Sequence, residues 1–228
     1  MGTWTISREL VPYPDALCEM AKRVEAIADG FADEQIWLLE HPPLYTAGTS
    51  ANLAAELLVP ESLPVHATGR GGRVTYHGPG QRIAYVMHDL RRRGSDVHAH
   101  VARLEAWVIR ALADLGVQGE RRKGRIGVWV CAPNANPDIG AIGTMGDAKI
   151  AALGVHVRRW VTSHGIAINV DPDLRAFQDI VPCGLPGYGI TSLRALGRSA
   201  TMEDLDAALR RHAGPVFGPG WEDSTARG

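Results

Sequence analysis

The chain has 228 residues, of which 45% are hydrophobic and 21% charged, and its formal net charge is −1. This ordinary globular composition argues against a disordered chain, and a protein without net positive charge is a poor candidate for binding nucleic acid. The sequence contains no apolar run long enough for a membrane span and no signal peptide, so we expect a cytoplasmic protein. We expect a single domain over residues 1–217 and a flexible tail over residues 218–228.

Apolar residues at helical spacing predict a first helix over residues 15–29, which ends at Gly30. The apolar run over residues 35–40 predicts a buried strand, because the prolines that follow it cannot continue a sheet. Residues 82–87 are almost wholly apolar and predict a strand that is covered on both faces. The longest apolar period, over residues 97–115, predicts a second helix that ends at Gly116.

The second half of the chain contains three β-like runs, at residues 126–130, 149–157 and 165–170. A stretch rich in glycine, proline and asparagine, residues 132–146, predicts a long loop between the first two runs. A last helix is expected to begin at Thr201, with Asp204 as its capping partner, and to end at Gly214. Consecutive strands with helices clustered elsewhere predict an α+β domain with a mixed β-sheet flanked by helices.

The stretch RGGRVTYHGPGQ, residues 70–81, combines four glycines with an aromatic ring and a histidine. It matches neither the P-loop pattern nor the dinucleotide-binding pattern, so a phosphate site is not favoured. Glycine lets the backbone lie close to a ligand, and Tyr76 and His77 can form walls beside it. The alternative is a turn without a ligand.

Two residues are candidates for covalent chemistry. Cys183 lies in IVPCGL, outside any helical or strand pattern, and is the candidate nucleophile, whereas Cys18 and Cys131 fall within a helix and a strand and are expected to be packed as small hydrophobic residues. Lys149 is one of three lysines in a chain rich in arginine. Lysine can give up its proton and arginine cannot, so Lys149 could exchange a proton with the thiol, the alternative being an ordinary surface lysine.

Histidines and arginines offer further candidates. His41, His77 and His164 could each act as a base or be structural, and the spacing of His98 and His100 does not suit a metal site. The basic runs at residues 91–93, 121–123 and 158–159 are expected to be solvated, the alternative being a docking site for an acidic carrier protein.

Five motifs occur in order between residues 40 and 185: EHPPLYTAG, RGGRVTYHGPGQ, KIAALGV, SHGIAINV and IVPCGL. Together they resemble the octanoyltransferase family of lipoate biosynthesis, over about two-thirds of the chain. The resemblance implies the fold of the catalytic domain of biotin and lipoate protein ligases. It also implies transfer of an octanoyl group from octanoyl-acyl carrier protein to a lysine of a lipoyl domain, without ATP, metal or another cofactor.

Carried over by position, Cys183 would be the nucleophile that forms a thioester, and Lys149 would lower the pKa of that thiol and act as acid and base. The implied substrate-binding residues are Arg70, Gly71, Gly72, Arg73, Val74, Thr75, Tyr76, His77, Ala152, Leu153, Gly154, Gly165, Ile166 and Ala167. His41 and His164 would support them. The implied acceptors are the lipoyl domains of 2-oxoacid dehydrogenase complexes and the glycine-cleavage H protein.

The stretch between GVWV and KIAALG is longer here than the resemblance leads us to expect, which affects the loop and not the lysine. Two alternatives stay open. An ATP-dependent lipoate or octanoate ligase of the same fold would need a nucleotide site, and a catalytically silent acyl- or carrier-binding module would not depend on Cys183.

Overall fold

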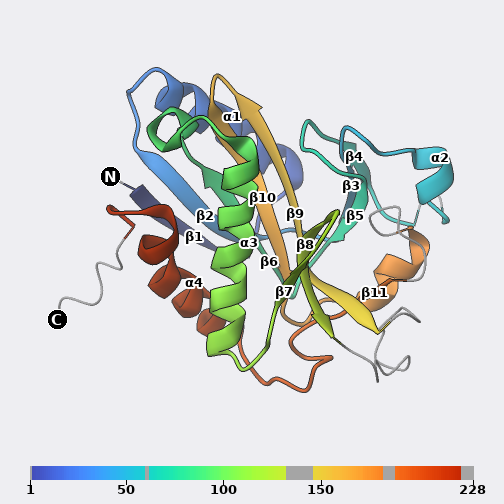
Figure 1. Ribbon diagram of the computed structural model, residues 1–228. Coiled ribbons are helices and arrows are strands. Elements are labelled where there is room, and N and C mark those ends of the chain that lie inside the picture. The colour runs from blue at the N-terminus through green and yellow to red at the C-terminus, as the bar shows by residue number, and fades with distance from the viewer. Residues whose placement is uncertain (1, 60–61, 132–145, 182–187, 222–228) are drawn as a thin grey trace.

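The computed structural model describes residues 2–59, 62–131, 146–181 and 188–221. Their largest unit is a mixed sheet in which seven strands run in the order β1-β2-β6-β10-β9-β8-β7 and β11 pairs with β9 (Figure 1). Its strands are β1 (Gly2–Leu10), β2 (Glu34–Glu40), β6 (Gln81–Met87), β7 (Glu120–Arg122), β8 (Arg125–Cys131), β9 (Asp147–Arg158), β10 (Val161–Asn169) and β11 (Gly189–Ile190). The pairs β1–β2 and β9–β11 are parallel, and the other pairs are antiparallel.

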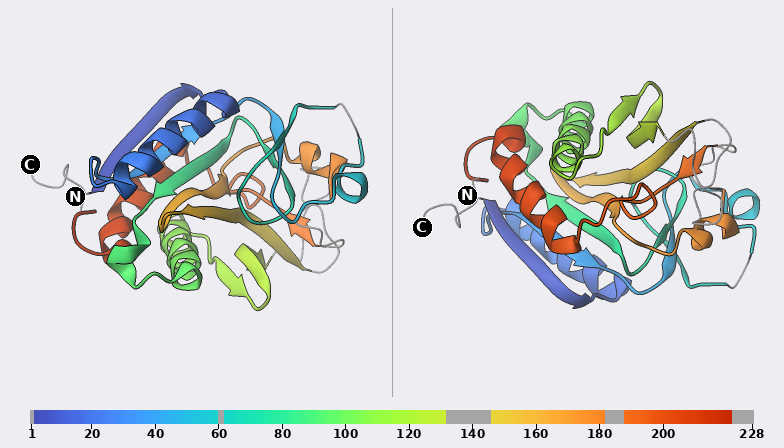
Figure 2. Two further views of the ribbon diagram at one scale, coloured as in Figure 1. Left: turned by 90° about the horizontal axis from the view of Figure 1, so that it is seen from above. Right: turned by 90° about the horizontal axis from the view of Figure 1, so that it is seen from below.

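Helices cover both faces of this sheet. α1 (Tyr13–Ala28) lies on one face, and α3 (Val97–Asp114) and α4 (Met202–Phe217) lie on the other, as Figures 1 and 2 show. Each helix turns its apolar stripe towards the sheet, which gives one buried cluster beneath α3 and α4 and a second beneath α1. β6 and β10 are buried along their whole length for this reason. The expected α+β fold with a mixed sheet and flanking helices is confirmed.

The helices predicted from apolar spacing agree with the structure at most of their ends. The predicted capping pair is present, since the Thr201 side chain accepts from the Asp204 amide and the Asp204 carboxylate accepts from the Thr201 amide. The predicted end at Gly214 is wrong, because α4 continues through Pro215 to Phe217. Phe217 is buried with its ring 5.1 Å from that of Trp107 on α3, so packing extends the helix past two residues that disfavour one.

A second, smaller sheet stands beside the ends of β9 and β10. Its strands are β3 (Leu44–Ala47), β4 (Val65–Ala67) and β5 (Val74–His77), in the order β4-β3-β5. The short helix α2 (Leu53–Glu56) and a 3-10 helix (Leu174–Asp179) lie close to it (Figure 1). The glycine-rich stretch over residues 70–81 is not a turn throughout, because its Val-Thr-Tyr-His run forms β5 and pairs with β3.

The C-terminal region also differs from the expectation. Trp221 is buried with its ring 5.9 Å from that of Trp4, and the Gly2 amide donates to the Gly220 carbonyl. The prediction of a flexible tail from residue 218 is therefore wrong for residues 218–221, which pack against β1. Residues 222–228 lie outside the described residues. None of the described helices is long and apolar enough to cross a membrane.

Two buried histidines beside the start of α3 make the fold sensitive to acid. The rings of His88 and His100 lie 5.6 Å apart, and no described residue forms a hydrogen bond with either ring. Burial, followed by the charges of Arg93 and Arg103, lowers the pKa of His100 to about 4. Burial also lowers the pKa of His88, with Arg93, His100 and Arg103 contributing.

Below pH 6.5 the unfolded chain binds a proton at His100 that the folded chain does not bind, so stability decreases as the pH falls towards 4. Because of His100, we expect the free energy of unfolding to be about 2 kcal/mol lower at pH 5 than at pH 7. Urea unfolding of the wild type and of His100→Leu at both pH values measures this. The variant should lose less stability than the wild type, and equal losses would contradict the prediction.

Candidate active site

A cavity of about 630 Å³ lies at the junction of the two sheets. It forms because β8 pairs with β9 only as far as Ala151, so that no described strand covers this edge of β9 from Ala152 onward. The glycine-rich segment approaches this edge, and the Gly71 amide donates to the Val155 carbonyl at 3.0 Å. Its lining comprises Tyr13, Ser50, residues 70–75, His77, Ile83, Tyr85, Val97, His98, Val101, residues 124–126, Lys149, residues 152–155 and residues 164–167.

The structure therefore brings together residues that lie far apart in the sequence. Every predicted substrate-binding residue except Tyr76 lines the cavity. Tyr76 lies in the apolar cluster of the small sheet, with its ring 5.4 Å from that of Phe177. Alternation along β5 explains the difference, because Thr75 and His77 line the cavity and Tyr76, between them, packs against the cluster.

Small residues form part of the wall that β9 and β10 present. Gly154 pairs with Gly165, and Ala152 pairs with Ala167. A Cβ atom on Gly154 would lie 2.7 Å from the Gly71 carbonyl oxygen, and one on Gly165, where φ is +152°, would lie 2.4 Å from the Ala84 oxygen. Glycine is thus required here for the close approach of the glycine-rich segment and of β6.

We expect Gly154→Ala to displace the glycine-rich segment and to raise the KM for the substrate that the cavity binds at least about tenfold, with a smaller effect on the free energy of unfolding. Steady-state kinetics together with urea unfolding separate these effects. Gly69→Ala is the matched control, since its Cβ would meet only the exposed ring of His156, at 3.3 Å, and that ring can move. Equal kinetic effects of the two variants would contradict the prediction.

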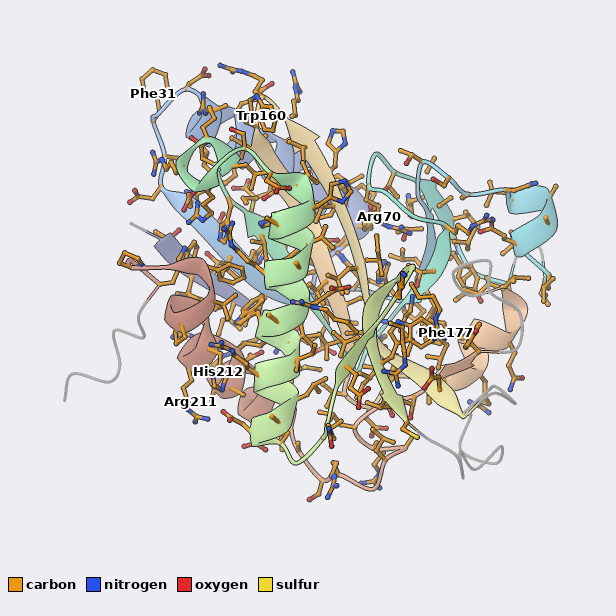
Figure 3. All side chains as sticks on the ribbon, in the orientation of Figure 1. Phe31, Arg70, Trp160, Phe177, Arg211 and His212 are labelled. Carbon is orange, nitrogen blue, oxygen red and sulfur yellow. The ribbon has the colours of Figure 1, made fainter. Side chains whose placement is uncertain are left out.

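Arg70 holds the glycine-rich segment in place. It is buried, and its guanidinium donates to the carbonyl oxygens of Thr46, Gly71 and Arg73 at 2.8–3.0 Å. Figure 3 shows Arg70 between the large and small sheets. This side chain therefore shapes the cavity through backbone contacts as well as contributing positive charge.

Lys149 is the one lysine of the chain that is buried. It is 5% exposed, whereas Lys22 and Lys123 are exposed. β9 places it between Trp129 of β8 and Ile190 of β11. Its Nζ donates to the Ile126 carbonyl at 3.0 Å and lies 4.7 Å from the centroid of the Trp129 ring. The alternative of an ordinary surface lysine is excluded.

Cys183 lies outside the described residues, and so does most of the predicted loop over residues 132–146. The other two cysteines are exposed free thiols, and neither lines the cavity. The interpretation of Cys18 and Cys131 as packed hydrophobic residues is wrong. Cys18 faces solvent because α1 buries the stripe that contains Ala16 and Met20.

Three buried histidines lie in or next to the cavity wall. Burial is the main reason why the pKa of His41 falls to about 4 and the pKa values of His77 and His164 fall to about 3. Nearby charges lower the last two further, with Arg70 acting on both. Groups with such pKa values are uncharged at neutral pH and are weak bases there, which favours structural roles.

Hydrogen bonds fix two of these rings. His41 Nδ1 donates to the Val11 carbonyl at 2.6 Å, and its Nε2 accepts from the Tyr85 hydroxyl at 2.7 Å. His77 Nδ1 donates to Gln81 at 2.7 Å, and its Nε2 lies 3.0 Å from Thr46 Oγ1. His41 does not line the cavity, whereas His77 and His164 do.

The described lining contains the basic side chains of Arg70, Arg73, Arg125 and Lys149 and no Asp or Glu, while Arg73 and Arg125 form ion pairs with Glu56 and Asp147 outside the lining. Such a surface favours a negative charge that develops within the cavity, for example a thiolate or an oxyanion. Because no described carboxylate lines it, carboxylate acid-base chemistry does not fit this part of the site.

The basic runs outside the cavity form ion pairs with acidic residues of the same chain. The pairs in these runs include Arg91–Asp89, Arg121–Glu105, Arg122–Asp147, Arg158–Glu25 and Arg159–Asp29. They agree with solvated faces, and nothing in their geometry favours docking of a carrier.

Several lining residues were not found from the sequence. These residues come from α1, β6, α3 and β8 and carry no motif: Tyr13, Tyr85, Val97, Val101 and Ile126. Only their apolar character predicted burial, and their convergence depends on how the elements pack.

Comparisons with known proteins show the family to which the chain belongs. Residues 13–214 match the family described as the lipoyl protein ligase A/B catalytic domain. An octanoyltransferase from Dinoroseobacter shibae is 56% identical over 216 residues, which cover 95% of this chain and 97% of that protein. An octanoyltransferase from Jannaschia sp. is 57% identical over 218 residues, covering 96% of this chain and all of that protein.

The chain belongs to the octanoyltransferase family. It is therefore an acyltransferase of protein lipoylation. The fold also resembles a bipartite lipoate protein ligase from Thermoplasma acidophilum, with a TM-score of 0.66 and 16% identity over 95% of this chain and 84% of that one. This confirms the expected ligase-like fold, whereas the octanoyltransferase assignment comes from the sequence relatives.

Proposed function

We propose that the enzyme transfers an octanoyl group from octanoyl-acyl carrier protein to the ε-amino group of a lysine on a lipoyl domain, through a thioester on Cys183. The observation that carries the proposal is that Lys149 is buried in the cavity wall, where no described lining residue is a carboxylate. Lys149 lines the cavity while its Nζ donates to the Ile126 carbonyl at 3.0 Å. The acceptors would be the lipoyl domains of 2-oxoacid dehydrogenase complexes and the glycine-cleavage H protein.

In the first half-reaction the thiol proton of Cys183 passes to Lys149, and the thiolate attacks the carbonyl carbon of the donor thioester. The oxyanion forms within a positively charged cavity, which stabilises it. The bond from carbon to the carrier's sulfur then breaks, and the departing thiolate takes the proton from Lys149. The enzyme is left with an octanoyl thioester on Cys183.

In the second half-reaction the neutral amine of the acceptor lysine attacks this thioester. Lys149 removes the proton that the nitrogen loses as the amide forms, and the Cys183 thiolate departs and is protonated again. The acyl group is already activated as a thioester, so amide formation requires no nucleotide. The mechanism uses only residues of this chain and needs no cofactor.

The setting of the site suits this chemistry. The cavity lining combines apolar residues such as Ile83, Leu153 and Ile166 with basic residues, which suits an acyl chain joined to a carrier. The two described cysteines are free thiols, which fits a cytoplasmic enzyme.

Transfer to an apo lipoyl domain tests the proposal. Octanoyl-acyl carrier protein should support octanoylation without ATP, whereas free octanoate should not, even with ATP and Mg²⁺. Mass spectrometry of the acceptor measures the product. Octanoylation that depends on ATP and free octanoate would contradict the proposal and support an ATP-dependent ligase.

A further inference from the structure

The two ends of the cavity differ in exposure. One end is lined by Tyr13, Tyr85 and His164, which are all buried. The other end includes His98 and Ile126, which are exposed, Ile126 by 59%. An apolar acyl tail gains most from the enclosed end, while the bulky carrier must stay outside. An entrance near Ile126 would therefore place the tail towards Tyr13 and His164.

The backbone turns His164 into this inner end. Its φ is +60°, a left-handed conformation that side chains other than glycine rarely adopt, and Gly165 follows with φ +152°. The ring consequently reaches the side of the sheet that α1 covers, where its backbone amide contacts Met20 and its Nε2 lies 3.4 Å from the Tyr13 hydroxyl. A strained conformation persists only where its surroundings impose it, and such residues gather at functional sites.

Among the described residues, the hydrogen bonds of the His164 ring are long, since its partners Tyr13 and Ser163 both lie at 3.4 Å. The Tyr85 ring also contacts it edge-on, with the centroids 5.8 Å apart. Burial, followed by the charges of Arg70 and His156, lowers the pKa of His164 to about 3. The ring is thus uncharged and can contact a hydrocarbon.

The distance along the sheet agrees with an eight-carbon chain. Eight backbone atoms amount to just under three residues, so an extended octanoyl group spans roughly 9 Å. Ala152, three residues along β9 from Lys149, lines a second small pocket together with Lys149 and is the reference point for this length. Three residues farther along β9 is Val155, which pairs with His164.

We propose that His164, backed by Tyr13, closes the acyl end of the cavity and determines the length of the chain that the enzyme transfers. This inference rests on the proposed function. It gives His164 the role of a specificity-determining wall in place of a base.

Two variants change the length of the space for the acyl chain in opposite directions. His164→Gly removes the ring at a backbone conformation that glycine adopts readily, so the fold should tolerate it. The ratio of kcat/KM for decanoyl- over octanoyl-acyl carrier protein should rise at least about tenfold. Ala167→Leu fills the space between Lys149 and His164 and should shift the preference from octanoyl to hexanoyl by a similar factor.

Arg159→Gly is the matched control, because Arg159 lies on the same hairpin with φ +52° and does not line the cavity. Its acyl preference should equal that of the wild type. If His164→Gly folds and its preference for decanoyl over octanoyl is unchanged, the proposal is overturned. It is also overturned if Val101→Ala, and not His164→Gly, prefers a longer chain, because the tail would then lie beneath α3. If His164→Gly does not fold, Ala167→Leu is the test, and an unchanged preference for octanoyl over hexanoyl would overturn the proposal.

Failure of this inference is distinguishable from failure of the proposed function. If wild-type enzyme transfers no acyl group from any carrier, the proposed function is wrong. If it transfers octanoyl normally and neither variant changes the preferred length, only the role of His164 is wrong.

Discussion

Cys183→Ser should lower kcat for octanoyl transfer by about a thousandfold or more, the size of effect seen when a nucleophile is removed from an enzyme that forms a covalent intermediate. A serine hydroxyl is far less acidic than a thiol, and an ester on serine is a poorer acyl donor to an amine than a thioester. Single-turnover transfer from octanoyl-acyl carrier protein to an apo lipoyl domain measures the loss.

Cys18→Ser and Cys131→Ser are the matched controls. Both residues are exposed free thiols that do not line the cavity, so these variants should transfer octanoyl groups at the wild-type rate. A Cys183→Ser enzyme with near wild-type activity would show that the reaction needs no thiol. An equal loss in all three variants would point to general damage.

Lys149→Arg and Lys149→Met should each lower kcat by about a hundredfold to ten-thousandfold, the range usual for loss of an acid-base group. Arginine keeps the positive charge but cannot exchange a proton, so its variant separates proton transfer from charge stabilisation. If charge alone matters, Lys149→Arg keeps most of its activity and Lys149→Met does not. That result would contradict the acid-base role.

Controls for Lys149 must account for its burial. The ammonium contacts the Ile126 carbonyl and the Trp129 ring, so either substitution also affects packing. Urea unfolding of each variant measures that effect separately from kcat. Lys123→Met, at an exposed position outside the cavity, should change neither stability nor rate.

The sequence predicted those parts of the fold whose pattern is local. α1 and α3 carry apolar residues at helical spacing, and residues 83–87 of β6 and 165–168 of β10 are apolar because both faces of the sheet are covered. Shorter strands were missed. β5 lies among glycines, and β1 carries polar residues along its exposed side, so neither shows the pattern of a buried strand.

The candidate site was predictable to the extent that its residues lie in motifs. Lys149 stood out because the chain has few lysines, and the structure buries it at the cavity. Tyr13 and Tyr85 had no such signal. Tyr13 reaches the cavity through the packing of α1 on the sheet, and Tyr85 reaches it through the position of β6 within the sheet. Conversely, Tyr76 belonged to a motif but faces the opposite side of β5, which the alternation of a strand explains once the strand is known.

The most direct test of the covalent mechanism is the intact mass of the enzyme after incubation with octanoyl-acyl carrier protein and no ATP. The account predicts one added octanoyl group on the wild type, none on Cys183→Ala, and slow addition on Lys149→Ala. Wild-type enzyme that stays unmodified while it octanoylates a lipoyl domain would contradict a thioester on Cys183.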